Sequence, residues 1–95
     1  MEKTLFQQLT QKQVKEYFTE DSTVFSTEIN NYIIQYGYDT GTDGYFVLVY
    51  DNLNDIYVLD IPENTMESSE QKASELLKEI QMKNREEIDF GVFKK

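Results

Sequence analysis

Apolar and polar residues alternate in the middle of the chain with the period of β-strands. In Ile33–Tyr38 and its flanks, every second side chain is aromatic or aliphatic, which predicts a half-buried strand. Tyr45–Tyr50 is apolar on both faces, which predicts a central strand. A third strand is predicted for Ile56–Ile61, and Pro62 is expected to end it. Short polar segments join these runs, so we expect an antiparallel meander.

The polar segments between the strands have the composition of tight turns. Residues 39–44 read Asp-Thr-Gly-Thr-Asp-Gly, and both Gly41 and Gly44 are available for positive φ. Residues 51–55 are expected to close a second hairpin. The first turn shares part of its spacing with a calcium-binding loop, but Gly41 and Tyr50 stand where such a loop needs oxygen ligands. A hairpin turn therefore explains these residues better.

Two further segments have the spacing of amphipathic helices. Thr4–Phe18 carries two apolar stripes, and Thr10 with Gln13 has the form of a capping box that would break this segment in two. Ser69–Met82 is predicted as the second helix. Its apolar stripe consists of Ala73, Leu76, Leu77 and Ile80. We expect both helices to cover one face of the sheet, with Tyr17 packed in the core, and the other face to carry tyrosines and acids in solvent.

The predicted fold is a single α+β domain spanning residues 1–95. It is a small antiparallel β-meander of three to four strands, flanked by an N-terminal and a C-terminal helix. Two segments leave alternatives open. Thr23–Ile29 fits a strand or a turn, and Ile88–Phe93 either adds a short edge strand or docks on the core. The residues expected to be largely buried are Phe18, Val47, Leu48, Leu76, Leu77 and Ile80.

The composition argues against catalysis. The sequence has no His, the residue most often used for general acid–base chemistry, and no Cys. Ser69 and Lys72 have the spacing of an S-x-x-K nucleophile, but a serine at the start of a helix is more often a cap. The four glycines form neither a Walker loop nor a dinucleotide-binding fingerprint. We expect no enzyme activity, no cofactor and no metal.

The charge distribution is the most informative feature of the sequence. Eighteen acids oppose nine bases, for a formal net charge of −9. Twelve of the acids, and none of the bases, lie between Glu16 and Gln71. Such a field repels nucleic acids and anionic membranes and attracts basic protein surfaces. Solubility alone is the competing explanation.

The sequence also favours the cytoplasm as the location of the protein. It contains no cysteine for disulfides, and residues 1–4 do not begin like a secretory signal. The longest apolar run, Tyr45–Tyr50, is too short to cross a bilayer.

Acids and tyrosines gather around the two predicted hairpin turns. Tyrosine is enriched at protein interfaces because it buries a large area and keeps a polar tip, whereas aromatic sites for single-stranded nucleic acid need nearby Lys or Arg. The tyrosine-rich region has no such bases, so we expect a protein partner and no direct nucleic-acid binding. The candidate partner-binding residues are Asp39, Asp43, Asp51, Asp55, Tyr36 and Tyr50.

In size, acidity and alternation of helices with a small sheet, the chain resembles small phage-encoded inhibitors that mimic DNA, including anti-CRISPR proteins, anti-restriction proteins and uracil-glycosylase inhibitors. No shared motif carries this resemblance. It implies an inhibitor or modulator that docks on the basic surface of a nucleic-acid-processing protein. Two other hypotheses are a toxin-neutralising or assembly partner, and a structural protein that forms homodimers through its β edge and tyrosine face.

Overall fold

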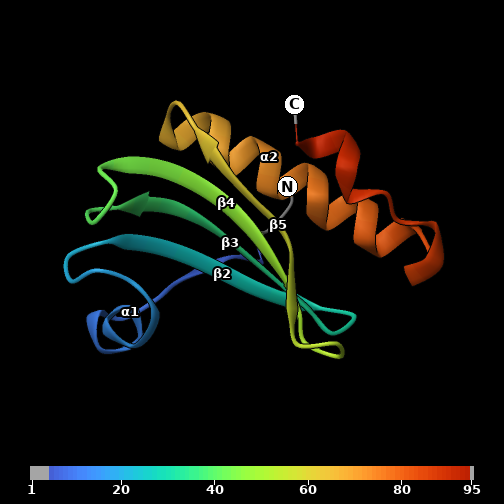
Figure 1. The fold of residues 1–95 in the computed structure, drawn as a ribbon, viewed down its shortest axis with the longest axis horizontal. Coiled ribbons are helices and arrows are strands. Elements are labelled where there is room, and N and C mark those ends of the chain that lie inside the picture. Colours follow the sequence, from blue (N-terminus) through green and yellow to red (C-terminus); the bar gives the residue numbers. More distant parts are fainter. Residues whose placement is uncertain (1–4, 95) are drawn as a thin grey trace.

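A five-stranded antiparallel sheet forms the centre of the protein, as seen in a computed structural model that describes residues 5–94 (Figure 1). In sequence order and in spatial order, the strands are β1 (Gln7–Gln8), β2 (Thr23–Ile29), β3 (Tyr32–Asp39), β4 (Gly44–Asp51) and β5 (Ile56–Glu63). The helices are α1 (Gln11–Tyr17), α2 (Met66–Met82) and the short 3-10 helices η1 (Arg85–Glu87) and η2 (Phe90–Phe93). Among residues 5–94, no helix is long and apolar enough to cross a membrane.

The three predicted strands are confirmed, and two more complete the sheet. Thr23–Ile29 is a strand, paired along its length with β3. Pro62 does not end β5, which continues to Glu63. A proline is tolerated there because β5 lies at the edge of the sheet, where one side of the strand has no ladder to maintain. The predicted meander of three to four strands is therefore one of five.

The N-terminal segment is only partly helical. The Thr10 hydroxyl accepts a hydrogen bond from the Gln13 amide at 3.2 Å, and the Gln13 side chain accepts one from the Thr10 amide at 2.8 Å, which confirms the capping box. Before this cap, the helix prediction is wrong because Gln7–Gln8 pairs with the edge of β2. A two-residue strand carries too little periodicity to be read from sequence. Thr4 lies outside the described residues.

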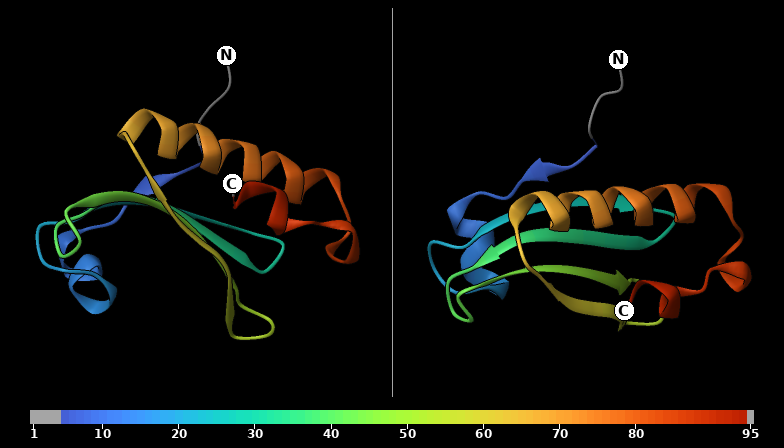
Figure 2. Two further views of the ribbon diagram at one scale, coloured as in Figure 1. Left: turned by 45° about the horizontal axis from the view of Figure 1, so that its top comes forward. Right: turned by 90° about the horizontal axis from the view of Figure 1, so that it is seen from above.

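The two helices lie on opposite faces of the sheet, contrary to the expectation that both would cover one face (Figure 2). Successive strand residues point to opposite faces, so a strand that is apolar at every position can bury both. On one face, α2 packs on a core of Tyr32, Ile34, Tyr36, Val47, Val49 and Leu59. On the other, Val14 of α1 packs on Val24, Phe46 and Leu48.

Most of the predicted core is confirmed. Val47, Leu48, Leu76 and Ile80 are buried. Leu77 and Phe18 are partly buried against the two clusters. Tyr17 is 76% exposed, so its assignment to the core is wrong. The C-terminal segment docks on the core through Ile88, Phe90 and Phe93 rather than adding a strand.

Positive φ angles in the turns fall on aspartate and asparagine rather than on the expected glycines. Asp43 has φ 54° and Asp55 has φ 58°, whereas neither Gly41 nor Gly44 has a positive φ. These short polar side chains tolerate the left-handed region better than other non-glycine residues. Gly37 in β3 is the one glycine with a positive φ, at 152°, and a Cβ there would collide with the Thr23 carbonyl oxygen of β2.

Candidate functional site

Helix α1 covers only one end of its face of the sheet. Directly opposite residues on neighbouring strands point to the same face, so the register defines rows that cross the sheet. The row beneath α1 contains Val24, Gly37 and Phe46. The next row contains Ser26, Gln35, Leu48 and Asp60, and the one after it contains Glu28, Ile33, Tyr50 and Tyr57. Helix α1 also covers Leu48, so the open part of this face consists of the last row together with Ser26, Gln35 and Asp60.

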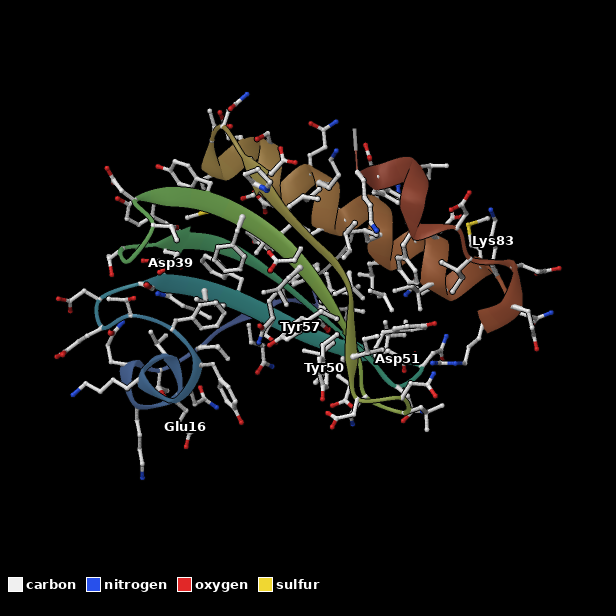
Figure 3. The ribbon with its side chains drawn as sticks, in the orientation of Figure 1. Glu16, Asp39, Tyr50, Asp51, Tyr57 and Lys83 are labelled. Carbon is white, nitrogen blue, oxygen red and sulfur yellow. The ribbon has the colours of Figure 1, made fainter. Side chains whose placement is uncertain are left out.

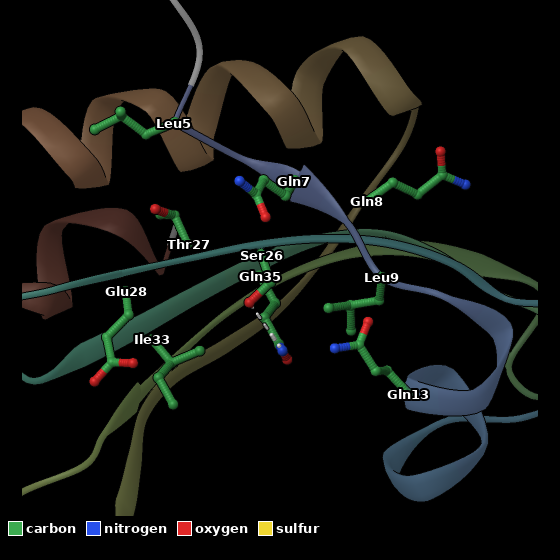
Figure 4. A pocket seen from close by; sticks show the side chains of 10 residues that line it. All are labelled: Leu5, Gln7, Gln8, Leu9, Gln13, Ser26, Thr27, Glu28, Ile33 and Gln35. Atoms are coloured by element: carbon green, nitrogen blue, oxygen red, sulfur yellow. Dashed lines mark hydrogen bonds between the residues drawn. The ribbon is translucent and has the colours of Figure 1, made fainter.

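Three hollows lie along this face: the first two lie over its open part, and the third continues beside α1 as far as Phe46 and Pro62. The first lies between β1, α1, β2 and β3, and Figure 4 shows the glutamines that line it, with Gln35 donating to the Ser26 hydroxyl at 3.2 Å. The second shares Ile33 and Gln35 with the first. The third shares Tyr17 and Tyr57 with the second. Because neighbouring hollows share lining residues, they adjoin one another from β1 to β5, and we call the three together the trough.

Two exposed tyrosines mark the β5 end of the trough. Tyr17 of α1 is 76% exposed and Tyr57 of β5 is 57% exposed, and both line the second and third hollows. Tyr50 meets Tyr57 edge to face, with ring centroids 4.9 Å apart. Figure 3 shows this pair on the side of the sheet that carries α1. Large aromatic rings left in solvent on one surface are typical of an interaction site.

The lining of the trough is acidic. It contains Glu28, Asp39 and Asp60, and none of the Lys and Arg residues that the structure describes lines any of its three hollows. The described bases lie on the two helices and in the C-terminal segment, and none lies on a strand. Lys72 of α2 is paired with Glu63 of β5 at 3.7 Å, and Lys83, directly after α2, is paired with Glu79 at 2.6 Å; α2 covers the opposite face. The lining is therefore negatively charged, and the bases nearest to it in sequence are Lys12 and Lys15 of α1, of which Lys15 is paired with Glu20 at 3.6 Å.

The four predicted loop acids do not gather on one surface. The turn with Asp39 and Asp43 and the turn with Asp51 and Asp55 lie at opposite ends of β4 (Figure 3). Eight residues of extended chain separate these ends by roughly 23 Å. One small partner surface cannot meet all four carboxylates at the same time.

At the first of these turns, Asp39 is on the rim of the trough and Asp43 is outside its lining. The Asp39 carboxylate accepts hydrogen bonds from the Ser22 hydroxyl at 3.3 Å and the Gly41 amide at 2.9 Å, which fix its orientation. Asp43 accepts a hydrogen bond from the Tyr38 hydroxyl, and this bond raises the pKa of Tyr38.

At the second turn, Asp51 is a structural residue. It is 4% exposed, and both of its carboxylate oxygens accept hydrogen bonds within the fold. Arg85 donates to it at 2.6 Å and lies 4.2 Å from the ring centroid of Tyr32. Burial opposes ionisation of this carboxyl, but hydrogen bonds from Asn54, Arg85 and the Leu53 amide outweigh it and lower the pKa of Asp51. Asp55 is exposed at the tip of this turn.

The two tyrosines predicted for the partner-binding site lie on opposite faces of the sheet. Tyr50 lines the trough, whereas Tyr36 is 4% exposed on the α2 face, stacked on Phe25 with centroids 5.0 Å apart. Burial raises the pKa of Tyr36 to about 12. Tyr36 therefore stabilises the core and presents no surface to a partner.

Sequence reasoning did not select Tyr17, Tyr57 or Asp60 for the candidate site. Tyr17 shares the helical stripe of Val14 and Phe18, so its spacing indicated core. Tyr57 and Asp60 both line the trough, although three positions separate them and strict alternation would place them on opposite faces. A register shift opposite Val49 and Tyr50 brings them to one face. Such a bulge has no sequence signal here.

Within residues 5–94, no three acidic, His or Cys side chains are grouped so as to hold a metal ion. Comparisons of the chain with protein-family models, curated proteins and solved structures returned no match.

Proposed function

We propose that the protein is a non-enzymatic binding protein that inhibits or modulates a partner by docking a basic surface of that partner against the trough. The observation that carries this proposal is the combination of two exposed tyrosines, Tyr17 and Tyr57, with acids and, among residues 5–94, no base in the lining of three adjoining hollows. Aromatic rings supply buried area on binding, and complementary charge speeds encounter and selects the partner.

In its finer form, the proposal is that the partner is a nucleic-acid-processing protein of the cytoplasm and that the trough competes with nucleic acid for its basic surface. The acidic field supports this, because the same charges that attract such a surface repel nucleic acid itself. Any mimicry of phosphates rests on Glu28, Asp39 and Asp60; Asp39 is the one loop aspartate in this set, because the two acidic turns lie at opposite ends of β4. A toxin or assembly partner that is merely basic is the second candidate.

Two triple variants with the same net charge test the proposal. The trough variant combines Glu28→Gln, Asp39→Asn and Asp60→Asn. The control combines Asp55→Asn, Glu75→Gln and Glu86→Gln, which are exposed and lie outside the lining. Basic proteins of the source cell that immobilised wild type retains are purified, and their binding kinetics are measured at two salt concentrations.

The trough variant should associate on the order of tenfold more slowly than the control, because the lost charges face the partner. Competition by added DNA identifies the DNA-mimic form, and its absence identifies the second candidate. Equal slowing of both triple variants contradicts the trough as the docking surface and reduces the acidity to a general field.

A further inference from the structure

We infer that the segment of the partner held in the trough is extended and basic, and that one arginine side chain lies between Tyr17 and Tyr57. This inference rests on the proposed function and specifies the chemistry of the occupant. It depends on the length of the trough, the polar groups at one end and the rings and acids at the other.

The length of the trough fits a short extended segment. The hollows cross the sheet from β1 to β5, and neighbouring strands are about 4.8 Å apart, so the trough spans roughly 19 Å. An extended chain advances about 3.3 Å per residue, so about six residues cross it. The hollows measure about 430, 480 and 530 Å³, which leaves room for side chains along the way.

The β1 end of the trough is suited to main-chain groups. Gln7, Gln8, Gln13 and Gln35 line the first hollow (Figure 4). Gln13 already accepts from the Thr10 amide and Gln35 already donates to Ser26, so the Gln13 side-chain nitrogen and the Gln35 side-chain oxygen remain for an occupant. A glutamine amide both donates and accepts hydrogen bonds, as a main-chain peptide unit does. An extended segment offers unpaired N–H and C=O groups to such amides, whereas a helix pairs those groups internally. The glutamines therefore favour an extended occupant over a helical one.

The β5 end is suited to a guanidinium group. The fold already contains one such arrangement, because Arg85 lies 4.2 Å from the Tyr32 ring centroid and 2.6 Å from an Asp51 oxygen. In the trough, Tyr17 and Tyr57 flank the same two hollows, and Asp39 and Asp60 line the third. The edge-to-face contact with Tyr50 holds the Tyr57 ring in place.

Arginine suits this end better than lysine does. Its guanidinium is planar, stacks on aromatic faces and is weakly hydrated, whereas the lysine ammonium is a compact and strongly hydrated charge. A second copy of this chain is a poor source of the arginine. Arg85 is the only arginine in the sequence, it is already bonded to Asp51, and each copy carries a net charge of −9.

Fluorescent peptides of about nine residues test the inference with the full-length protein. One peptide carries three arginines among serines and glutamines, and the other carries three lysines in the same positions. Anisotropy titrations at low ionic strength measure both affinities for wild type and for Tyr17→Leu and Tyr57→Leu, which keep apolar bulk but remove the aromatic ring. Leu53→Ala, an exposed change at the β4–β5 turn outside the lining, is the matched control.

The arginine peptide should bind about two- to fivefold more tightly than the lysine peptide. Each tyrosine variant should lose this preference, and Leu53→Ala should keep it. Equal affinities for the two peptides, with binding still weakened by the trough acid variant, would overturn the arginine assignment and leave the proposed function intact. If a folded basic partner binds but neither peptide does, the inference that the occupant is an extended segment is wrong. If the protein forms a dimer that Tyr57→Leu dissociates, the occupant is a second copy of this chain, and the inference is also wrong.

Discussion

Asp51 and Asp55 lie at the two ends of the same turn, but only Asp51 is buried and hydrogen-bonded within the fold. Asp51 is buried and joins the β4–β5 turn to the C-terminal segment through Arg85, while Asp55 is exposed at the tip with φ 58°. A buried carboxylate must be paired, because an unpaired one is costly to remove from water. The two residues therefore have the same chemistry and different roles.

Asp51→Asn should lower the free energy of unfolding by roughly 1–3 kcal/mol, because it removes the charged acceptor of Arg85 inside the protein. Asp55→Asn is the matched control and should leave stability nearly unchanged, since asparagine also tolerates a positive φ. Urea unfolding at neutral pH measures both. Equal effects of the two changes would contradict a structural role for Asp51.

The pH dependence of this effect follows from the lowered pKa of Asp51. A carboxyl whose pKa is lower when folded contributes stability that is present above its unfolded pKa, about 3.9, and is lost as the pH falls through the folded value. The difference between wild type and Asp51→Asn should therefore shrink below about pH 4. A difference that persists at lower pH would show that the variant acts through packing.

Gly37 is constrained by the backbone of the adjacent strand. Gly37→Ala should destabilise the protein by about 1–3 kcal/mol, because the residue has φ 152° and its new Cβ meets the Thr23 carbonyl oxygen. Gly44→Ala is the control, since its φ is not positive and the nearest atom to the added Cβ is 3.8 Å away. Thermal unfolding compares the two, and similar melting temperatures would contradict the close approach.

At the scale of elements, α2 provides the clearest test of the core. Leu76 is fully buried and Leu77 is only partly buried, although both belong to the apolar stripe. Leu76→Ala should cost about 2–5 kcal/mol of unfolding free energy, and Leu77→Ala should cost less, because a cavity at a partly exposed site can fill with water or collapse. Denaturant titration of both variants measures the order, and the reverse order would place the inner face of α2 one residue further along.

The elements also show which features a sequence of this kind makes predictable. Strong periodicity predicted β3, β4, β5 and α2, and the Thr10 cap predicted the start of α1. The short strand β1 and the face covered by α1 depend on tertiary pairing that leaves no local pattern. The candidate site was less predictable still: the predicted strand Tyr45–Tyr50 already implied that the two acidic turns lie at its opposite ends, but the register shift of β5 and the face covered by α1 leave no sequence pattern.

Across the whole molecule, the part of the chain without bases also forms the sheet that carries the trough. Residues 23–63, which form β2 to β5 and their turns, contain no base, and the trough lies on the α1 face of this sheet. The bases are confined to the helices and the terminal segments. The part of the sheet that α1 leaves uncovered therefore has acids and no described base in its lining.

This imbalance predicts opposite effects of salt on stability and on binding. Because the eighteen acids outnumber the nine bases, repulsion among the acids outweighs the attraction within the few ion pairs. Salt screens this repulsion, so added salt should raise the melting temperature. The same screening should weaken association with a basic partner. Thermal unfolding and binding kinetics, both measured in dilute buffer and at about 0.5 M salt, where the Debye length falls to roughly 4 Å, test the two effects together.

A melting temperature that falls with salt would show that pairs such as Arg85 with Asp51 outweigh the general repulsion. If instead it rises while association slows, loss of binding at high salt cannot be attributed to unfolding, and the acids act on the partner directly.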